Sequence, residues 1–285
     1  MIPDRYITRT QVVKCCRFNM SDIYVHGHHE SVLRSHTWRT IENSAKYLKP
    51  YLKPESTLLD VGCGPGNITL EFAEKLRFGN VIGIDASEAI IKKAQENYRA
   101  SNLDNCSFRI GDAYSLDFED NSFDIVHAHQ LLQHLKNPIA AIQEMYRVVR
   151  PEGIVAVRDA DYGGMIWSPN DPRLNEWMDL YHRMTKINNV EPDAGRFLFS
   201  WVSQIPFSSI AVSSSTWTFA TPEMRDWWGG LWAERIQKST FSEQVLVHGL
   251  ADQNLLNELS EAFKHWAKQS DGFFLVPHGE ILAIK

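Results

Sequence analysis

Residues 57–68 read TLLDVGCGPGNI, and this stretch decides the fold. Leucine and valine surround Asp60 and predict a short buried strand, and the glycines at 62, 64 and 66 predict a tight turn into a helix. Glycines let the backbone approach a ligand where a helix N-terminus presents free N–H groups. The stretch therefore predicts a ligand at one edge of a sheet, although tight strand–helix turns also use glycine for steric reasons alone.

The sequence around this stretch alternates between strand-like and helix-like patterns. Short apolar runs are separated by longer stretches with apolar residues at helical spacing. These patterns predict strands at 57–62, 80–87, 106–112, 123–130 and 153–161, helices at 68–76, 87–100 and 138–149, and two later strands at 208–220 and 272–284. The expected fold class is α/β, with a doubly wound, mostly parallel sheet of seven strands.

Two further segments surround this core. Residues 31–52 carry apolar residues at helical spacing and predict a helical segment that Pro54 ends. Eight of the nine tryptophans lie after Asp161, which predicts an aromatic-rich cap. The expected organisation is an N-terminal helical lid at 1–54 and a main domain at 55–285, which divides into a ligand-binding core at 55–160 and a substrate cap with the last two strands at 161–285.

Composition and charge exclude several classes of partner. Apolar residues make up 44% and charged residues 22% of the 285 residues, so the chain is expected to fold. The net charge of −6 lacks the basic excess of nucleic-acid-binding proteins. The sequence has no run of 18 apolar residues and no secretory signal, which predicts a cytoplasmic protein without a membrane span. A small-molecule substrate is expected, and the sequence leaves a homodimer open.

An acidic residue stands at the end of the second predicted strand. Asp85 lies 19 residues beyond Gly66, a separation at which a carboxylate accepts hydrogen bonds from both hydroxyls of a ribose. The glycine spacing is G-x-G-x-G, with Asn67 where a nicotinamide-dependent oxidoreductase would need its third glycine. The residues therefore indicate a ligand with a nucleoside part, and such an oxidoreductase is the weaker alternative.

The ordered motifs resemble those of the class I S-adenosylmethionine-dependent methyltransferases, particularly the ubiquinone and menaquinone biosynthesis C-methyltransferases. LLDVGCGPGNITLEFA is similar to their first motif, VIGIDASEAII to the second, IGDAYSLDFEDNSFDIVHAHQLLQHL to the next two, and EMYRVVRPEGIVAVRD to the last. The resemblance covers residues 56–160 and implies a Rossmann-like methyltransferase fold with S-adenosyl-L-methionine as cofactor. HQLL at 129–132 replaces the Asn-Pro-Pro-Tyr motif of amino-group methyltransferases, which argues against an adenine or glutamine amide substrate.

The resemblance also implies which residues bind the cofactor. They are Asp60, Gly62, Cys63 and Gly64 at the methionine part, Asp85 at the ribose, Asp112 and the Ala113 amide at the adenine, and Ala86 and His134 without an assigned part. His129, which ends the fourth strand, is expected to contact the methionine part and to face the substrate. His129 is also the candidate catalytic base, because histidine suits proton transfer at neutral pH. The alternative is a histidine that only bonds the cofactor.

Residues 24–30 read YVHGHHE, and three histidines in four positions raise the question of a metal site. No second set of ligands stands at a defined spacing, and the four cysteines form no metal or disulfide pattern, so no metal is expected. The resemblance favours a lid that folds over the cleft. Its candidate contacts to the cofactor carboxylate or the substrate are Tyr24, His28, His29 and Arg34.

Residues 227–232 read WWGGLW and allow more than one interpretation. The indoles could line a pocket for a planar or cationic substrate, or they could be buried as helix core, whereas the two glycines favour a turn pressed against a neighbour. Asp159 and Asp161 either position a polar group of the acceptor or cap a loop. The expected function is methyl transfer to carbon, oxygen or sulfur of a small apolar or aromatic metabolite. The alternative is a non-catalytic nucleoside-binding relative that acts as a partner or regulator.

Overall fold

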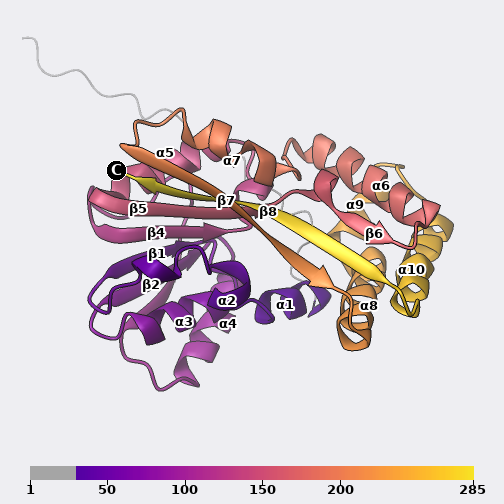
Figure 1. Ribbon diagram of the computed structural model, residues 1–285, viewed down its shortest axis with the longest axis horizontal. Coiled ribbons are helices and arrows are strands. Elements are labelled where there is room, and N and C mark those ends of the chain that lie inside the picture. The colour runs from indigo at the N-terminus through magenta and orange to yellow at the C-terminus, as the bar shows by residue number, and fades with distance from the viewer. Residues whose placement is uncertain (1–29) are drawn as a thin grey trace, which may run out of the picture.

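The computed structural model describes residues 30–285, and its centre is one mixed sheet. The sheet contains all seven predicted strands, which are β1 (Thr57–Val61), β2 (Asn80–Asp85), β3 (Cys106–Ile110), β4 (Phe123–His129), β5 (Val149–Ala160), β7 (Ser209–Phe219) and β8 (Phe273–Ile284). Their order is β3-β2-β1-β4-β5-β8-β7, and Figure 1 shows β2, β1, β4 and β5 following one another across the sheet. Neighbours from β3 to β5 are parallel, and β8 is antiparallel to both β5 and β7. The predicted fold class is therefore confirmed.

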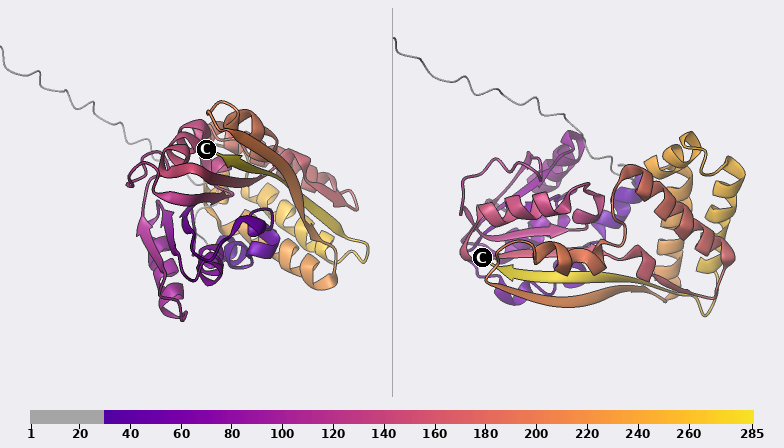
Figure 2. Two further views of the ribbon diagram at one scale, coloured as in Figure 1. Left: turned by 60° about the vertical axis from the view of Figure 1, so that its left-hand side comes forward. Right: turned by 90° about the horizontal axis from the view of Figure 1, so that it is seen from above.

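An eighth strand, β6 (Ile166–Ser168), was not predicted from the sequence. It pairs antiparallel with the first three residues of β8, beyond the part of β8 that pairs with β5. β7 pairs with β8 over the whole length of β7. The two long strands therefore run from the sheet core into the helical cap, as both views of Figure 2 make clear.

Helices cover both faces of the sheet core. One face carries α3 (Asn67–Lys75) and α4 (Glu88–Arg99), and the other carries α5 (Pro138–Val148) and α7 (Ala194–Val202). Local sequence sets where α4 and α5 begin, because the side chains of Ser87 and Asn137 accept hydrogen bonds from the first-turn N–H groups of Ile90 and Ala140. Within the described residues, no helix is long and apolar enough to cross a membrane.

The cap has its own hydrophobic core between α6 (Pro172–Asn188), α8 (Pro222–Lys238), α9 (Thr240–Val247) and α10 (Gln253–Ala267). Trp228 and Trp232 are both buried in this core, so the core interpretation of the tryptophan cluster is right for these two residues. The expected glycine turn is wrong, because α8 continues through it. A Cβ atom on Gly229 would lie 2.8 Å from the Phe263 carbonyl oxygen, so this glycine lets α8 approach α10 closely.

The helical segment predicted at 31–52 is broken into shorter pieces. They are α1 (Glu30–Thr37), α2 (Ile41–Ser44) and a 3-10 turn at Lys49–Tyr51. Thr40 restarts the helix, because its hydroxyl accepts from the Asn43 N–H while the Asn43 side chain accepts from the Thr40 N–H. The resulting bend between α1 and α2 brings residues 36 and 39 to the cavity described below.

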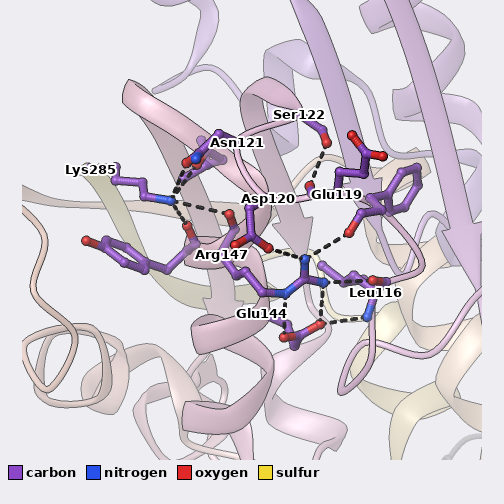
Figure 3. Close-up of polar contacts among 11 residues, drawn as sticks. Leu116, Glu119, Asp120, Asn121, Ser122, Glu144, Arg147 and Lys285 are labelled. Carbon is purple, nitrogen blue, oxygen red and sulfur yellow. Dashed lines mark hydrogen bonds and ion pairs between the residues drawn. The ribbon is translucent and has the colours of Figure 1, made fainter.

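Two cations fasten the C-terminal end of α5 (Figure 3). The Lys285 ammonium donates to the Tyr146 and Val149 carbonyl oxygens at 2.8 and 2.9 Å and to the Asn121 side chain at 2.8 Å. Arg147 donates to Glu144 and to the carbonyl oxygen of Leu116 at 2.8 Å. These contacts tie the end of β8 and the loop before β4 to α5.

Candidate active site

A cavity of about 710 Å³ opens at the carboxyl ends of β1, β2 and β4. This volume lies within the range of about 300–1,000 Å³ that small-molecule sites occupy. The strand order reverses between β1 and β4, which is where α/β sheets bind ligands. The cavity brings together ten of the predicted residues, namely Asp60, Gly62, Cys63, Gly64, Asp85, Ala86, Asp112, Ala113, His129 and His134.

The glycine-rich turn forms one wall of the cavity. Gly62 and Gly66 have φ angles of +72° and +85°, a region that glycine adopts without strain. A Cβ atom would lie 2.9 Å from a Leu131 methyl carbon at Gly62 and 2.6 Å from the Phe108 ring at Gly66. The N–H groups of Gly62 and Cys63 both donate to the Ile84 carbonyl oxygen, which fixes the turn against β2. Burial first, and then Asp60, raises the pKa of the Cys63 thiol, so a reactive thiolate is not favoured.

Two carboxylates are held by backbone N–H groups on the nucleoside side of the predicted site. Asp85 Oδ2 accepts from the Gly64 N–H at 3.1 Å, and its Oδ1 accepts from the Ser87 N–H at 3.0 Å. Asp112 Oδ1 accepts from the Tyr114 N–H at 2.9 Å. Each carboxylate therefore has a fixed position at the cavity wall while remaining able to accept further hydrogen bonds.

Asp60 differs from the other two acids because the residue is 3% exposed and its carboxylate is hydrogen-bonded within the protein. Its Oδ1 lies 2.7 Å from His127 Nδ1, and its Oδ2 accepts from the Thr69 hydroxyl at 2.5 Å. His127 lies on β4 and Thr69 on α3, so the contacts join β1 to its neighbour in the sheet and to the helix that follows the turn. The arrangement makes Asp60 a support of the glycine turn as well as part of the cavity wall.

His129 ends β4 and is 5% exposed. Neither ring nitrogen has a hydrogen-bond partner among residues 30–285, and the ring centroid lies 5.7 Å from that of Trp217 on β7. Burial, followed by the nearby Arg39 and Arg158 guanidinium groups, holds the pKa of His129 well below its ordinary value. The imidazole is therefore neutral, with a lone pair available on one nitrogen.

His134 lies in a short 3-10 turn (Leu132–His134) after β4. Its Nε2 lies 3.0 Å from the Gln133 side-chain nitrogen, and burial, helped by Arg39 and Arg235, lowers its pKa to about 3. A hydrogen bond to β5 holds this turn in place, because the Gln133 N–H donates to Asp159 Oδ1 at 3.1 Å. Burial raises the pKa of Asp159 to about 7. Asp159 thus supports the cavity wall from within the protein.

Sequence reasoning missed a polar group formed by Arg39, Gln130 and His278. An Arg39 Nη atom donates to Gln130 Oε1, and Gln130 Nε2 lies 2.9 Å from His278 Nε2. His278 Nδ1 lies 3.0 Å from the Val276 carbonyl oxygen, which can only accept, so Nε2 is the acceptor for the Gln130 amide. Gln130 has a φ of +51°, an uncommon value for a residue with a side chain. The one sequence signal that pointed to Gln130 was its position directly after His129.

Other expected contacts have different outcomes. Tyr24, His28 and His29 lie outside the described residues. Arg34 was expected at the cofactor or substrate, but it forms an ion pair with Glu234 of α8. Asp161 caps a loop, because it accepts from the Gly164 N–H at 2.9 Å and pairs with Arg196. Arg34 therefore joins α1 to the cap, and the loop interpretation of Asp161 is supported.

Comparison with known proteins identifies the family. The family model described as a methyltransferase domain matches residues 52–227. An uncharacterized methyltransferase of Schizosaccharomyces pombe is 35% identical over 91% of this chain and 95% of its own length. A demethylmenaquinone methyltransferase of Desulfitobacterium hafniense is 40% identical over 38% of this chain and 43% of its own length. The phosphoethanolamine N-methyltransferase 2 of Haemonchus contortus, solved with S-adenosylhomocysteine, has a TM-score of 0.53 at 21% identity, and the match covers 85% of this chain and 52% of that one.

The residues around the cavity fit S-adenosylmethionine in size and chemistry. The cavity is large enough for a small-molecule cofactor, and it offers fixed carboxylates to hydroxyl or amino donors. The orphaned, buried ring nitrogens of His129 are polar atoms of the kind that a bound ligand satisfies. The family assignment excludes the nicotinamide-dependent oxidoreductase. From the motifs, the sheet order, the cavity and the relatives together, we conclude that this chain belongs to the class I S-adenosylmethionine-dependent methyltransferases.

Proposed function

We propose that this methyltransferase transfers the methyl group to carbon, oxygen or sulfur of a small apolar or aromatic metabolite. The proposal rests on the difference between the side chains on the two sides of the cavity. Carboxylates of β1, β2 and the residues after β3 line one side, whereas His129 on the other side contacts Trp217. A second cavity, of about 20 Å³, lies beyond Gln130 and is bordered by aromatic residues and Met165 as well as by Arg39 and Arg235. Aromatic and thioether groups favour an apolar or aromatic ligand.

In this proposal the nucleoside part of the cofactor lies against β2 and β3. Asp85 accepts from the two ribose hydroxyls, and Asp112 with the Ala113 amide binds the adenine. The turn at 62–64 and His129 contact the methionine part, and Ala86 and His134 complete the wall. When bound, S-adenosylmethionine supplies a methyl group on a positively charged sulfur.

The protein has two tasks during transfer. It holds the acceptor atom, the methyl carbon and the sulfur in line, and it excludes water. As the new bond to the acceptor forms, the carbon–sulfur bond breaks, its electron pair stays on sulfur, and the acceptor loses a proton. His129 is the proposed proton acceptor, since its neutral ring has no hydrogen-bond partner among the described residues. Its lowered pKa makes it a weak base, which suits an acidic acceptor such as a phenol, a thiol or an activated carbon acid.

The test is transfer of a labelled methyl group to defined compounds. The protein is incubated with methyl-labelled S-adenosylmethionine and a panel of small phenols, aromatic thiols and quinols, with sugars and polyols as the comparison set. We expect labelled product from the aromatic set and none from the sugars. Labelling of sugars or of amines alone would overturn the proposed acceptor class. A protein that binds S-adenosylhomocysteine but labels no compound in a metabolite extract would support the non-catalytic alternative instead.

A further inference from the structure

Gln133 is the central residue of the short 3-10 turn Leu132–His134, and it is buried. Its main chain and its side chain both bond to the end of β5. The Gln133 N–H donates to Asp159 Oδ1 at 3.1 Å, and Gln133 Oε1 accepts from the Ala160 N–H at 3.2 Å. The turn after β4 is therefore fixed to β5 at two points, and neither bond uses the amide nitrogen of the Gln133 side chain.

The contact with Ala160 determines which way the Gln133 amide faces. A backbone N–H can only donate, so the atom that faces it must be the amide oxygen. The amide nitrogen then faces His134, where it lies 3.0 Å from the ring atom Nε2. The positions of oxygen and nitrogen in this side chain therefore follow from a backbone group that can play only one part.

The orientation of Gln133 in turn determines where His134 carries its proton. An amide nitrogen only donates, so Nε2 of His134 has to accept with its lone pair. A neutral imidazole then carries its single proton on Nδ1, whereas a protonated ring would point Nε2–H at a second donor. The lowered pKa of His134 agrees with a neutral ring. The conclusion depends on the contact at Nε2 alone and holds for any partner of Nδ1.

We infer that Gln133 is a positioning residue, which holds the His134 ring in its Nδ1–H form at the wall of the large cavity. His134 lines this cavity and Gln133 does not, so the glutamine acts through the histidine. The inference rests on the proposed function, in which His134 belongs to the wall that binds the cofactor. In the Nδ1–H form the ring presents a donor at Nδ1, whereas a ring with its proton on Nε2 presents an acceptor there. Gln133 thereby sets the hydrogen-bonding character of this part of the wall.

A second glutamine, three residues earlier, provides a contrast. Gln130 Nε2 lies 2.9 Å from Nε2 of His278, and Nδ1 of His278 lies 3.0 Å from the Val276 carbonyl oxygen. This ring also carries its proton on Nδ1, but here the backbone contact belongs to the histidine, so the histidine orients the glutamine. At Gln133 the backbone contact belongs to the glutamine instead. A change at Gln133 should therefore alter the tautomer of His134 and leave that of His278 as it is.

Nuclear magnetic resonance reads the tautomer directly. The full chain is labelled with nitrogen-15 histidine, and long-range proton–nitrogen correlation spectra at pH 7 report which ring nitrogen carries the proton. The signals of His134 are identified by their absence from the spectrum of His134→Asn. We expect the Nδ1–H form for both His134 and His278. An Nε2–H form or a protonated ring at His134 would overturn the inference, and this measurement needs no variant of Gln133.

Gln133→Glu then tests the positioning role. One carboxylate oxygen replaces the amide oxygen at the Ala160 N–H, and the other replaces the amide nitrogen beside His134. Because a carboxylate only accepts, His134 should place a proton on Nε2, while His278 serves as the unchanged reference in the same spectrum. We expect the affinity for S-adenosylhomocysteine, measured by calorimetry, to fall at least about fivefold, as the loss of one hydrogen bond implies. Gln204→Glu, at an exposed position after α7, is the matched control and should change neither result.

The outcomes separate this inference from the proposed function. An unchanged tautomer of His134 in Gln133→Glu would overturn the inference, as would an unchanged affinity for S-adenosylhomocysteine after the tautomer has switched. If Gln133→Glu does not fold, Gln133→Met removes the same donor without adding a charge, and His134 should then lose its single Nδ1–H form. Failure of the unaltered chain to bind S-adenosylhomocysteine would count against the proposed cofactor site, and the spectra would still decide the tautomer.

Discussion

His127 Nδ1 lies 2.7 Å from Asp60 Oδ1 in an interior where both side chains are almost wholly buried. The second carboxylate oxygen accepts from Thr69, so Asp60 links β1, β4 and α3 directly below the glycine turn. Asp60, which belongs to the first motif, therefore has a structural role in this chain besides any contact with the cofactor.

Removal of the Asp60 carboxylate should destabilise the fold. Asp60→Ala leaves the polar groups of His127 and Thr69 buried without their acceptor, and we expect the free energy of unfolding to fall by about 2–5 kcal/mol. Urea denaturation followed by circular dichroism measures the change. Asp104→Ala, at an exposed position before β3, is the control and should stay within about 0.5 kcal/mol. A similar small change in both variants would show that the buried contacts contribute little.

Asp85 should control cofactor affinity. Asp85→Ala removes the proposed acceptor for the ribose hydroxyls and releases the N–H groups of Gly64 and Ser87. We expect the affinity for S-adenosylhomocysteine to weaken by about 1–3 kcal/mol, measured by calorimetry. Asp226→Ala, on the exposed side of α8, should leave it unchanged. Unchanged affinity in the Asp85 variant would remove this residue from the proposed role.

His129 should affect turnover more than binding. If it accepts the proton, His129→Asn lowers kcat by about 100-fold or more and changes the affinity for S-adenosylhomocysteine little. Because its pKa lies well below the ordinary value of 6.5, the ring stays neutral near that pH, and turnover should not fall there as the pH is lowered. Asp226→Ala, on the exposed side of α8, is the control and should leave kcat unchanged. A pH profile with a midpoint near 6.5, or normal turnover in His129→Asn, would contradict the proposed base.

The His182–Asp193 pair should make the stability of the cap depend on pH. Its Nε2–Oδ1 distance is 2.9 Å. The hydrogen bond with Asp193 raises the pKa of His182, so the stability that this histidine adds is lost as pH rises through the raised value. Burial opposes ionisation of Asp193, but hydrogen bonds from His182 and the Gly163 N–H outweigh it and lower its pKa. The stability that this aspartate adds is therefore lost as pH falls through the lowered value.

The contribution of the pair should consequently be greatest between the ordinary pKa values of 3.8 and 6.5. Thermal melts of the unaltered chain and of His182→Gln should differ most at pH 5 and less at pH 8.5. The difference should be modest, because the histidine side chain is 33% exposed. A difference in Tm that does not vary with pH would mean that the ion pair adds nothing beyond packing.

Lys285 should stabilise the end of α5. The last carbonyl groups of a helix lack partners within the helix, and this ammonium group supplies donors to two carbonyl groups there (Figure 3). Lys285→Met should lower the free energy of unfolding by about 1–2 kcal/mol in urea titrations. Lys264→Met, which loses only an exposed pair with Glu261 on α10, is the comparison. Equal effects of the two substitutions would rule out a special role for the C-terminal lysine.

The sheet could be predicted because each of its strands is encoded by a short, continuous stretch of the sequence. Each strand from β1 to β5 carries its own apolar run, and the turn at 62–66 carries its own glycines. β6 was missed because three residues are too few to display an alternating pattern. The break in the N-terminal helix was missed because Thr40 and Asn43 satisfy each other, a contact between two ordinary polar residues.

The proposed cofactor side of the cavity could be predicted from motifs, whereas the proposed acceptor side could not. Asp85 is the last residue of β2 and Asp112 lies two residues after β3, so their position at the sheet edge is set by the nearby sequence. Arg39 lies between α1 and α2, Arg235 on α8 and His278 on β8, and only the packing of these segments brings them to the same region. Similarly, the glycines of α8 suggested a turn, because their partner, α10, is distant in sequence.

β7 and β8 run from the sheet core into the cap, so these two parts of the molecule cannot be separated. The same strand completes the sheet beside β5 and forms part of the cap core. A fragment that ended near residue 160 would keep every cofactor motif, yet β5 would become an open edge whose backbone groups could pair with another chain. The smallest folding unit is therefore much longer than the region that carries the motifs, and the cap cannot be exchanged as a detachable module.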